Sequence, residues 1–331
     1  MEDGAFLKDL VARYRAELII PAKPELCALT DKHIAPHLDA IVRDMLELRV
    51  ETDAHFREQI AGRLGAMPQA DEGMAAQPAT YPISYCLEIT RYMLMLMSRE
   101  PVPTHMGGLR AIHDFVRAGG PVKRVWGALR GGYFQNAIQV GTFYLDVAND
   151  TVNPAKPKIE LLPMADANFN NIGSYFEFAR VGAAYWKCRT IPNRYFPNLA
   201  PFYPAIAFDK SGVARFESRN SFMFPMNIAR RFEPARDFVL GDDVGGGTLD
   251  PYIDWLQRYA ARDPRTSDRA HPLWFCRDAD AELHESFRAI AAQDVQALTQ
   301  SAKRALASDT HFLNIPELGG DALPHMNGAE V

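Results

Sequence analysis

Apolar residues recur every three or four positions along several stretches of the chain, which is the period of a helix with one buried face. In the first of these stretches the recurring residues include Phe6, Leu10 and Tyr14. Pro21 and Pro24 end this helix, because proline removes a backbone donor. The same period predicts helices over residues 6–20, 31–48, 53–64, 84–97, 172–185, 250–260 and 279–306, the last with a break.

Alternation of apolar and polar residues, the period of a half-buried strand, takes over in the middle of the chain. It predicts strands over residues 122–130, 133–140 and 143–147, with glycine-containing turns between them. Shorter strands are predicted over residues 159–162, 204–208, 213–217 and 221–225. Because short turns join neighbouring strands, we expect the sheet to be antiparallel.

Together these elements predict an α+β fold. We expect one compact domain built from a helical section (1–66), an α+β core with the antiparallel sheet (81–240) and a C-terminal helical section (250–307). The residues between 65 and 82, poor in large apolar side chains, are typical of a linker. The Gly-rich segment 241–248 predicts a mobile loop or lid, and the residues after 308 predict an extended or partly disordered tail.

The composition is that of a globular protein, since 47% of the 331 residues are hydrophobic and 23% are charged. With 36 basic and 41 acidic residues the net charge is -5, which argues against nucleic acid as a partner, because no net positive field would attract phosphates. No apolar run reaches the roughly 18 residues of a membrane helix, and the N-terminus does not resemble a signal peptide. We therefore expect a cytoplasmic protein with no membrane partner; a protein exported without a cleaved signal would have the same composition.

The four cysteines, at positions 27, 86, 188 and 276, contain no CxxC pair. This spacing predicts reduced thiols and indicates neither a zinc site nor a disulfide framework. His33 and His37 have a spacing that can bind a metal on a helix, but no acidic third ligand accompanies them. We expect no metal and no cofactor.

Cys86 occupies the most informative position of the four cysteines. Ser84 is a favourable helix N-cap, which places Cys86 in the first turn of the helix that runs to Met97. Free amide N–H groups and the positive end of the helix dipole favour a thiolate there, as a reactive cysteine requires. The alternative interpretation is a small buried hydrophobic residue on a core helix.

The strands after this helix carry polar residues. Gln135 and Asn136 lie on the second predicted strand, and Asp146 lies among apolar residues on the third, where a carboxylate needs a partner. A helix with an N-terminal cysteine, followed by antiparallel strands with a polar residue on the second and an acid on the third, resembles the core of the transglutaminase-like cysteine proteins. The resemblance is one of order and spacing, and it covers residues 81–152.

The resemblance implies a mechanism in which Cys86 attacks an acyl group and Asp146 orients the general base. The family's histidine has no counterpart, since the matching position holds Asn136 or, one register earlier, Gln135. Neither amide is a base near neutral pH.

Three alternatives remain for the missing base. His113 or His105 supplies it, the site serves a different chemistry or binding, or the order of elements arose independently. His113 lies beside the apolar face of residues 109–117, a position that is also typical of a solvated or capping histidine.

Two functional hypotheses follow. The first is a cysteine-dependent acyltransferase or amide/ester hydrolase for a small-molecule or peptide acyl substrate, with Gln135 or Asn136 contacting the substrate or the oxyanion. The second is a non-catalytic descendant of the fold that acts as a binding or scaffold protein through the aromatic residues of 186–203. A metal-dependent enzyme with scattered His and acidic ligands is a third, weaker alternative. Nothing in the pattern predicts an oligomeric state.

Overall fold

The computed structural model describes residues 3–66, 81–208, 214–217, 222–241 and 250–307. Contacts divide the chain into two compact units: residues 16–171, here the helix–sheet unit, and residues 1–15 with 172–331, here the C-terminal unit. This boundary falls inside the expected core section 81–240 and does not follow the sections expected from sequence. Local periodicity locates elements, but it carries no information on which of them share a core. The expected linker (67–80), lid (242–248) and tail (308–331) lie outside the described residues.

The N-terminal part of the chain is helical, as expected, but its helices have different bounds. They are α1 (Asp3–Glu17), α2 (Pro24–His33), the short 3-10 turn η1 (Ala35–His37) and α3 (Leu38–Ala66). Pro24 begins α2 in its first turn, where its missing N–H costs nothing.

The two helices predicted over residues 31–48 and 53–64 are wrong, because α3 is a single continuous helix. Arg49 and Thr52 are fully buried, so they interrupt the apolar period at positions that still face the core.

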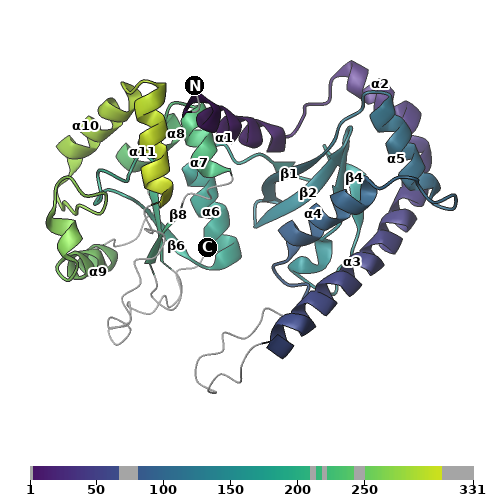
Figure 1. Ribbon diagram of the computed structural model, residues 1–331, viewed down its shortest axis with the longest axis horizontal. Coiled ribbons are helices and arrows are strands. Elements are labelled where there is room, and N and C mark those ends of the chain that lie inside the picture. Colours follow the sequence, from purple (N-terminus) through teal and green to yellow (C-terminus); the bar gives the residue numbers. More distant parts are fainter. Residues whose placement is uncertain (1–2, 67–80, 209–213, 218–221, 242–249, 308–331) are drawn as a thin grey trace. The chain divides into compact units, whose positions relative to one another are not determined.

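The helix–sheet unit contains a five-stranded sheet in the order β4-β3-β2-β1-β5, and every neighbouring pair is antiparallel. The strands are β1 (Val122–Leu129), β2 (Tyr133–Val140), β3 (Phe143–Asp146), β4 (Glu160–Pro163) and β5 (Phe169–Asn170). The β1–β2 turn places Arg130 and Gly131 at positive φ, and the β2–β3 turn does the same with Gly141. The antiparallel sheet expected from the alternation is therefore confirmed, and with the helices around it gives an α+β fold (Figure 1).

The two faces of this sheet belong to different cores. The helices α4 (Cys86–Met97) and α5 (Gly107–Arg117) share one core with α3 and with Ile138 and Leu145 of the sheet (Figure 1). The opposite face buries a smaller cluster that includes Ala137 and Tyr144. Because successive strand residues point to opposite faces, neighbouring residues of β2 enter different environments.

The C-terminal unit is also α+β. Its three-stranded antiparallel sheet has the order β6-β7-β8, with β6 (Arg189–Pro192), β7 (Ala205–Phe208) and β8 (Ala214–Glu217), so the predicted hairpin is confirmed. Its helices are α6 (Tyr175–Trp186), α7 (Met223–Ala229), α8 (Glu233–Leu240), α9 (Asp250–Ala260), η3 (Pro264–Ser267), α10 (Asp280–Ala291) and α11 (Val295–Ala307). The strand predicted over 221–225 is wrong, because α7 begins there. Phe222, Met223 and Phe224 are all buried, and such a short apolar run fits a buried helix as well as a strand.

The aromatic residues between 186 and 203 form core in the C-terminal unit. Tyr195, Phe196, Phe202 and Tyr203 are all buried, and their rings pack on other aromatic rings such as Phe275, Phe216 and Phe224. None of these four side chains is therefore an exposed platform for a partner. Among the described helices, none combines the length and the apolar character that crossing a bilayer requires.

Candidate functional site

The start of α4 places Cys86 at the first helical position. Tyr85 is the N-cap and makes no side-chain capping bond, so the expected Ser84 cap is wrong by one residue. Ser84 instead adopts a positive φ of 67°, and its backbone N–H donates to the carbonyl of Thr151 at 3.1 Å. This contact ties the entry to α4 to the turn after β3. Cys86 does lie in the first turn, as the sequence predicts.

The Cys86 thiol lies next to the side-chain amide of Asn136, which a hydrogen bond from Arg124 holds in place. Asn136 Nδ2 lies 3.5 Å from Cys86 Sγ, and Asn136 Oδ1 accepts a 2.7 Å hydrogen bond from Arg124 Nη1. The Thr90 hydroxyl donates to the backbone carbonyl of Asn136 at 3.2 Å. Arg124 in turn pairs with Glu17. Because Arg124 requires an acceptor, the amide nitrogen of Asn136 faces the sulfur.

Burial controls the ionisation of this thiol. Cys86 is partly exposed, but burial of its sulfur raises the thiol pKa above its ordinary value, and the hydrogen bonds from Asn136 offset only part of that effect. The negative charge of Asp146 raises the pKa further. The position in the helix's first turn therefore does not produce a thiolate near neutral pH.

Gln135 and Asp146 meet on the other face of the sheet, in a group that we call the Asp146 cluster (Gln135, Tyr144, Asp146 and the Ala148 N–H). Gln135 Nε2 donates to Asp146 Oδ2 at 2.6 Å, and the Tyr144 hydroxyl donates to the same oxygen at 3.1 Å. The Ala148 N–H donates to Asp146 Oδ1 at 2.8 Å. Burial raises the pKa of Asp146 to about 6, although these three bonds act in the opposite direction. Gln135 Oε1 is buried with no hydrogen-bond partner among the described residues.

The residues singled out from the sequence therefore form two groups. Asn136 shares its face of β2 with Ile138 and the α4 core, whereas Gln135 shares the opposite face with Ala137. The sheet places Cys86 with Asn136, and Gln135 with Asp146. No hydrogen bond within the described residues joins Cys86 to Asp146.

Neither histidine proposed as an alternative base hydrogen-bonds to the thiol. His113 Nε2 lies 2.7 Å from the carbonyl of Met97, and Nδ1 lies 3.2 Å from Glu100 Oε1. Met97 ends α4, so along the helix axis it lies about 16 Å from Cys86 at 1.5 Å per residue. His105 pairs at 3.0 Å with Glu47 on α3.

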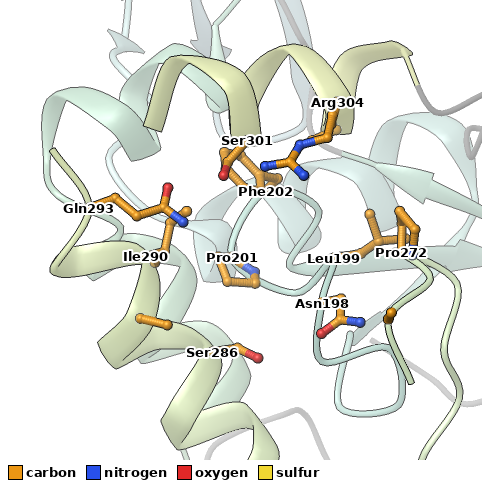
Figure 2. Close-up of a pocket in the computed structure, with 13 residues that line it drawn as sticks. Asn198, Leu199, Pro201, Phe202, Pro272, Ser286, Ile290, Gln293, Ser301 and Arg304 are labelled. Carbon is orange, nitrogen blue, oxygen red and sulfur yellow. The ribbon is translucent and has the colours of Figure 1, made fainter. Parts of the chain in front are cut away.

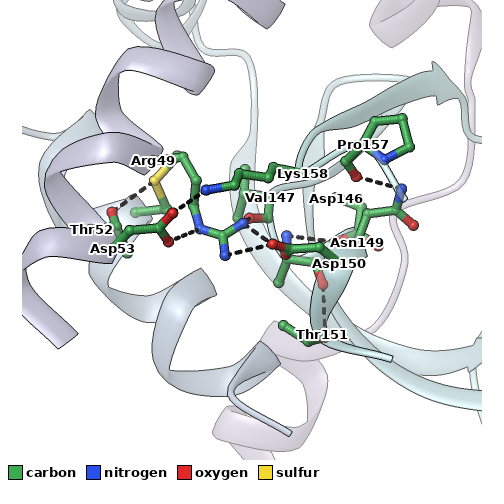
Figure 3. Close-up of polar contacts among 12 residues, drawn as sticks. Arg49, Thr52, Asp53, Asp146, Val147, Asn149, Asp150, Thr151, Pro157 and Lys158 are labelled. Atoms are coloured by element: carbon green, nitrogen blue, oxygen red, sulfur yellow. Dashed lines mark hydrogen bonds and ion pairs between the residues drawn. The ribbon is translucent and has the colours of Figure 1, made fainter. Parts of the chain in front are cut away.

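A buried ionic group, which we call the Arg49 network (Arg49, Asp53, Tyr81, Asp150 and Lys158), lies between α3 and the turn after β3. Arg49 makes two hydrogen bonds to the Asp150 carboxylate, at 2.9 and 3.2 Å, and its Nε lies 2.9 Å from Asp53 (Figure 3). Tyr81 and Lys158 also bind Asp53. Neither Arg49 nor Asp150 is among the site residues predicted from the sequence. The gap in the apolar period of α3 at residue 49 was the available signal.

A cavity of about 350 Å³, here the His113 cavity, opens near the C-terminal ends of α4 and α5. Its apolar lining comes from Leu94, Met97, Ile112, Val116 and Val122, and its polar lining from Ser98, Glu100, His113 and Arg117. Because the cavity borders Met97 rather than Cys86, it is separate from the thiol.

Comparison with known proteins identifies no relative: no family model, no curated protein and no solved structure matches this chain. Within the described residues, no three or more His, Cys, Asp or Glu side chains gather as metal ligands would.

Proposed function

We propose that the helix–sheet unit is a non-catalytic binding module with a transglutaminase-like order of helix and strands. The observation that carries this proposal is the partner of Cys86, an asparagine amide fixed by Arg124. An amide cannot take the thiol proton near neutral pH, and the raised pKa of Cys86 keeps that proton in place.

The position of Asp146 supports the same function. An orienting carboxylate has to contact the catalytic base, but Asp146 accepts its bonds from Gln135, Tyr144 and the Ala148 N–H on the other sheet face. These partners are fixed and largely neutral. The strand residues that resemble catalytic positions therefore act as buried structural groups.

The His113 cavity is the binding site that this function uses. Its apolar wall suits a small apolar molecule or an apolar side chain, while His113, Glu100 and Arg117 supply a few oriented polar groups. His113 is largely buried and already contacts Glu100, so it is a fixed part of the cavity wall.

Iodoacetamide labelling of each cysteine against pH tests the non-catalytic assignment, with Cys86→Ala to identify the Cys86 signal. We expect slow labelling of Cys86 in the folded protein, with a midpoint above the free-thiol value of about 8.5. Asn136→His should lower this midpoint, because an imidazolium stabilises the thiolate. Rapid labelling of the unsubstituted protein with a midpoint well below the free-thiol value would contradict the proposal.

Ligand-observed NMR with indole and cyclohexanol tests the binding site. Val116→Trp should fill the His113 cavity and abolish binding, because Val116 lines it. Val50→Trp is the matched control, since Val50 is also an exposed helical valine but lies on α3 outside the cavity. If the unsubstituted protein binds neither probe, or if Val116→Trp binds them equally well, the assignment of the cavity is wrong.

Cysteine-dependent acyl transfer is the second candidate, favoured by one specific observation. Cys86 is partly exposed at the N-terminus of α4, and Asn136 Nδ2 could donate to an oxyanion formed beside the sulfur. A stoichiometric burst of p-nitrophenolate from p-nitrophenyl acetate, absent in Cys86→Ala, would support this candidate. Release at the rate of buffer alone would exclude it for this ester.

A further inference from the structure

The C-terminal unit contains a cavity that plays no part in the function proposed above. It has a volume of about 410 Å³, within the range of small-molecule sites. Its walls come from the segment between β6 and β7, the loop at residues 270–272, and the helices α10 and α11. Figure 2 shows side chains from these segments surrounding the cavity.

The charged part of the cavity lining is basic. Arg304 is the one charged residue in the lining, and no acidic side chain lines the described cavity. Its only hydrogen bond among the described residues runs from Nε to the carbonyl of Gln300, at 3.4 Å, so both terminal nitrogens are available. Although the net charge of the chain is -5, a cavity whose charged lining residue is an unpaired arginine has a locally positive lining, which favours an anionic ligand.

Hydroxyl and amide groups line the same cavity as Arg304. Ser301 and Arg304 are three residues apart on α11, so both lie on one side of the helix, and Figure 2 shows them on the same wall of the cavity. Ser286 and Gln293 line the cavity from α10 and the connection that follows it. These groups can donate to an anion, and they make no side-chain hydrogen bond among the described residues.

Gln293 adds a second, independent observation. Its Oε1 atom is buried and has no hydrogen-bond partner among the described residues. A buried acceptor without a donor destabilises a protein, and most such groups in proteins are satisfied. A ligand with an N–H or O–H group would supply the missing donor.

The remaining wall is apolar. Leu199, Pro201, Phe202 and Ile290 line it together with small residues such as Ala289. Phe202 and Ile290 are themselves largely buried, so this wall is part of the packed core of the C-terminal unit. An apolar body attached to an anionic group would cover this surface and displace water from it.

We propose that this cavity binds a small organic anion, a carboxylate or a phosphate monoester on an apolar body. The anion faces Arg304 and Ser301, the apolar body packs on Phe202 and Ile290, and a donor on the ligand bonds Gln293.

Isothermal titration with 4-hydroxybenzoate and 4-hydroxyphenyl phosphate tests this site, with 4-hydroxybenzyl alcohol as the uncharged probe, so that every probe carries an O–H donor for Gln293. We expect at least one anion to bind more tightly than the alcohol, with an affinity that falls as salt is added. Arg304→Gln should weaken anion binding about tenfold, the effect of one charge-assisted hydrogen bond. Arg262→Gln is the matched control, since Arg262 is an exposed arginine of the same unit outside the cavity.

Two further variants locate the binding. Ala289→Trp should fill the cavity and abolish anion binding, whereas Val116→Trp, in the His113 cavity, should leave it unchanged. Binding of only one of the two anions identifies the anionic group. The proposal is overturned if neither anion binds at millimolar concentration, if the alcohol binds as tightly, or if Arg304→Gln binds like the unsubstituted protein.

Discussion

The Arg49 network and the Asp146 cluster both bury carboxyl groups in the helix–sheet unit, yet they stabilise them differently. Asp53, in the Arg49 network, contacts Lys158, Tyr81 and the guanidinium of Arg49. Burial by itself would raise its pKa, but these hydrogen bonds and charges lower it. In the described part of the chain Asp146 hydrogen-bonds no cation, and burial raises its pKa to about 6. The depth of burial and the charge of the partners together set the pKa of each carboxyl: Asp146 is the more deeply buried of the two, and Asp53 has the cationic partners.

This difference gives the two groups opposite pH dependence. The folded state lowers the pKa of Asp53, so Asp53 stabilises the protein above the ordinary carboxyl pKa and loses that effect as the pH falls. The folded state raises the pKa of Asp146, so its stabilising effect is complete below 3.8 and is lost as the pH rises through about 6.

The largest effect is expected from removing the cation of the Arg49 network. Arg49→Met leaves Asp53 and Asp150 buried without their shared guanidinium, and we expect a loss of about 3–5 kcal/mol in the free energy of unfolding. Denaturant unfolding at neutral pH measures it. Arg99→Met is the control, because Arg99 and Glu51 form an exposed pair and the change should be hardly measurable. Equal losses in the two variants would contradict the distinction between the buried Arg49 network and the exposed Arg99–Glu51 pair.

The next effect concerns the pH dependence of the Asp146 cluster. Asp146→Asn removes the titrating group, so the stability of the unsubstituted protein relative to this variant should fall between pH 4 and pH 7. The difference between the pKa values of 3.8 and about 6 predicts a change of about 3 kcal/mol. Unfolding curves of both proteins over this pH range measure it, and parallel pH profiles would show that Asp146 keeps an ordinary pKa.

For Asp53→Asn we expect a pH dependence of the opposite sign to that of Asp146→Asn: the stability difference from the unsubstituted protein should grow as the pH rises. Above the ordinary carboxyl pKa the variant lacks the ion pairs of Asp53 with Lys158 and Arg49. We therefore expect a loss of about 2 kcal/mol in the free energy of unfolding. The difference from the unsubstituted protein should shrink as the pH falls, because Asp53 is then protonated there too. A difference that stays constant from pH 7 to pH 3 would mean that the charge of Asp53 contributes nothing.

The smallest effect is expected from Tyr144→Phe, which removes one donor to Asp146 Oδ2. Burial and the charge of Asp146 raise the pKa of Tyr144 well above its ordinary value, so the hydroxyl remains a donor at neutral pH. We expect a loss of about 1 kcal/mol at pH 7. In the Asp146→Asn background the same substitution should cost less. An unchanged cost in that background would place the effect outside the cluster.

Much of the fold could be predicted from local pattern. The strands β1, β2 and β3 lie within one or two residues of their predicted bounds, because alternation and turn glycines act over a few positions. The break in α3 was predicted wrongly because Arg49 and Thr52 are polar but buried, and α7 was missed because its apolar run is too short to reveal a period.

The features of the candidate site likewise divide into those set by local sequence and those set by the tertiary structure. By itself the sequence determined that Cys86 lies in a helix's first turn and that Gln135 and Asn136 point to opposite faces, since both depend on local geometry. Only the tertiary structure decided which face α4 covers and hence which amide meets the thiol. Asn136 lies 50 residues from Cys86 and Arg49 lies 101 from Asp150, and contacts over such separations set burial and partners, which no local pattern records.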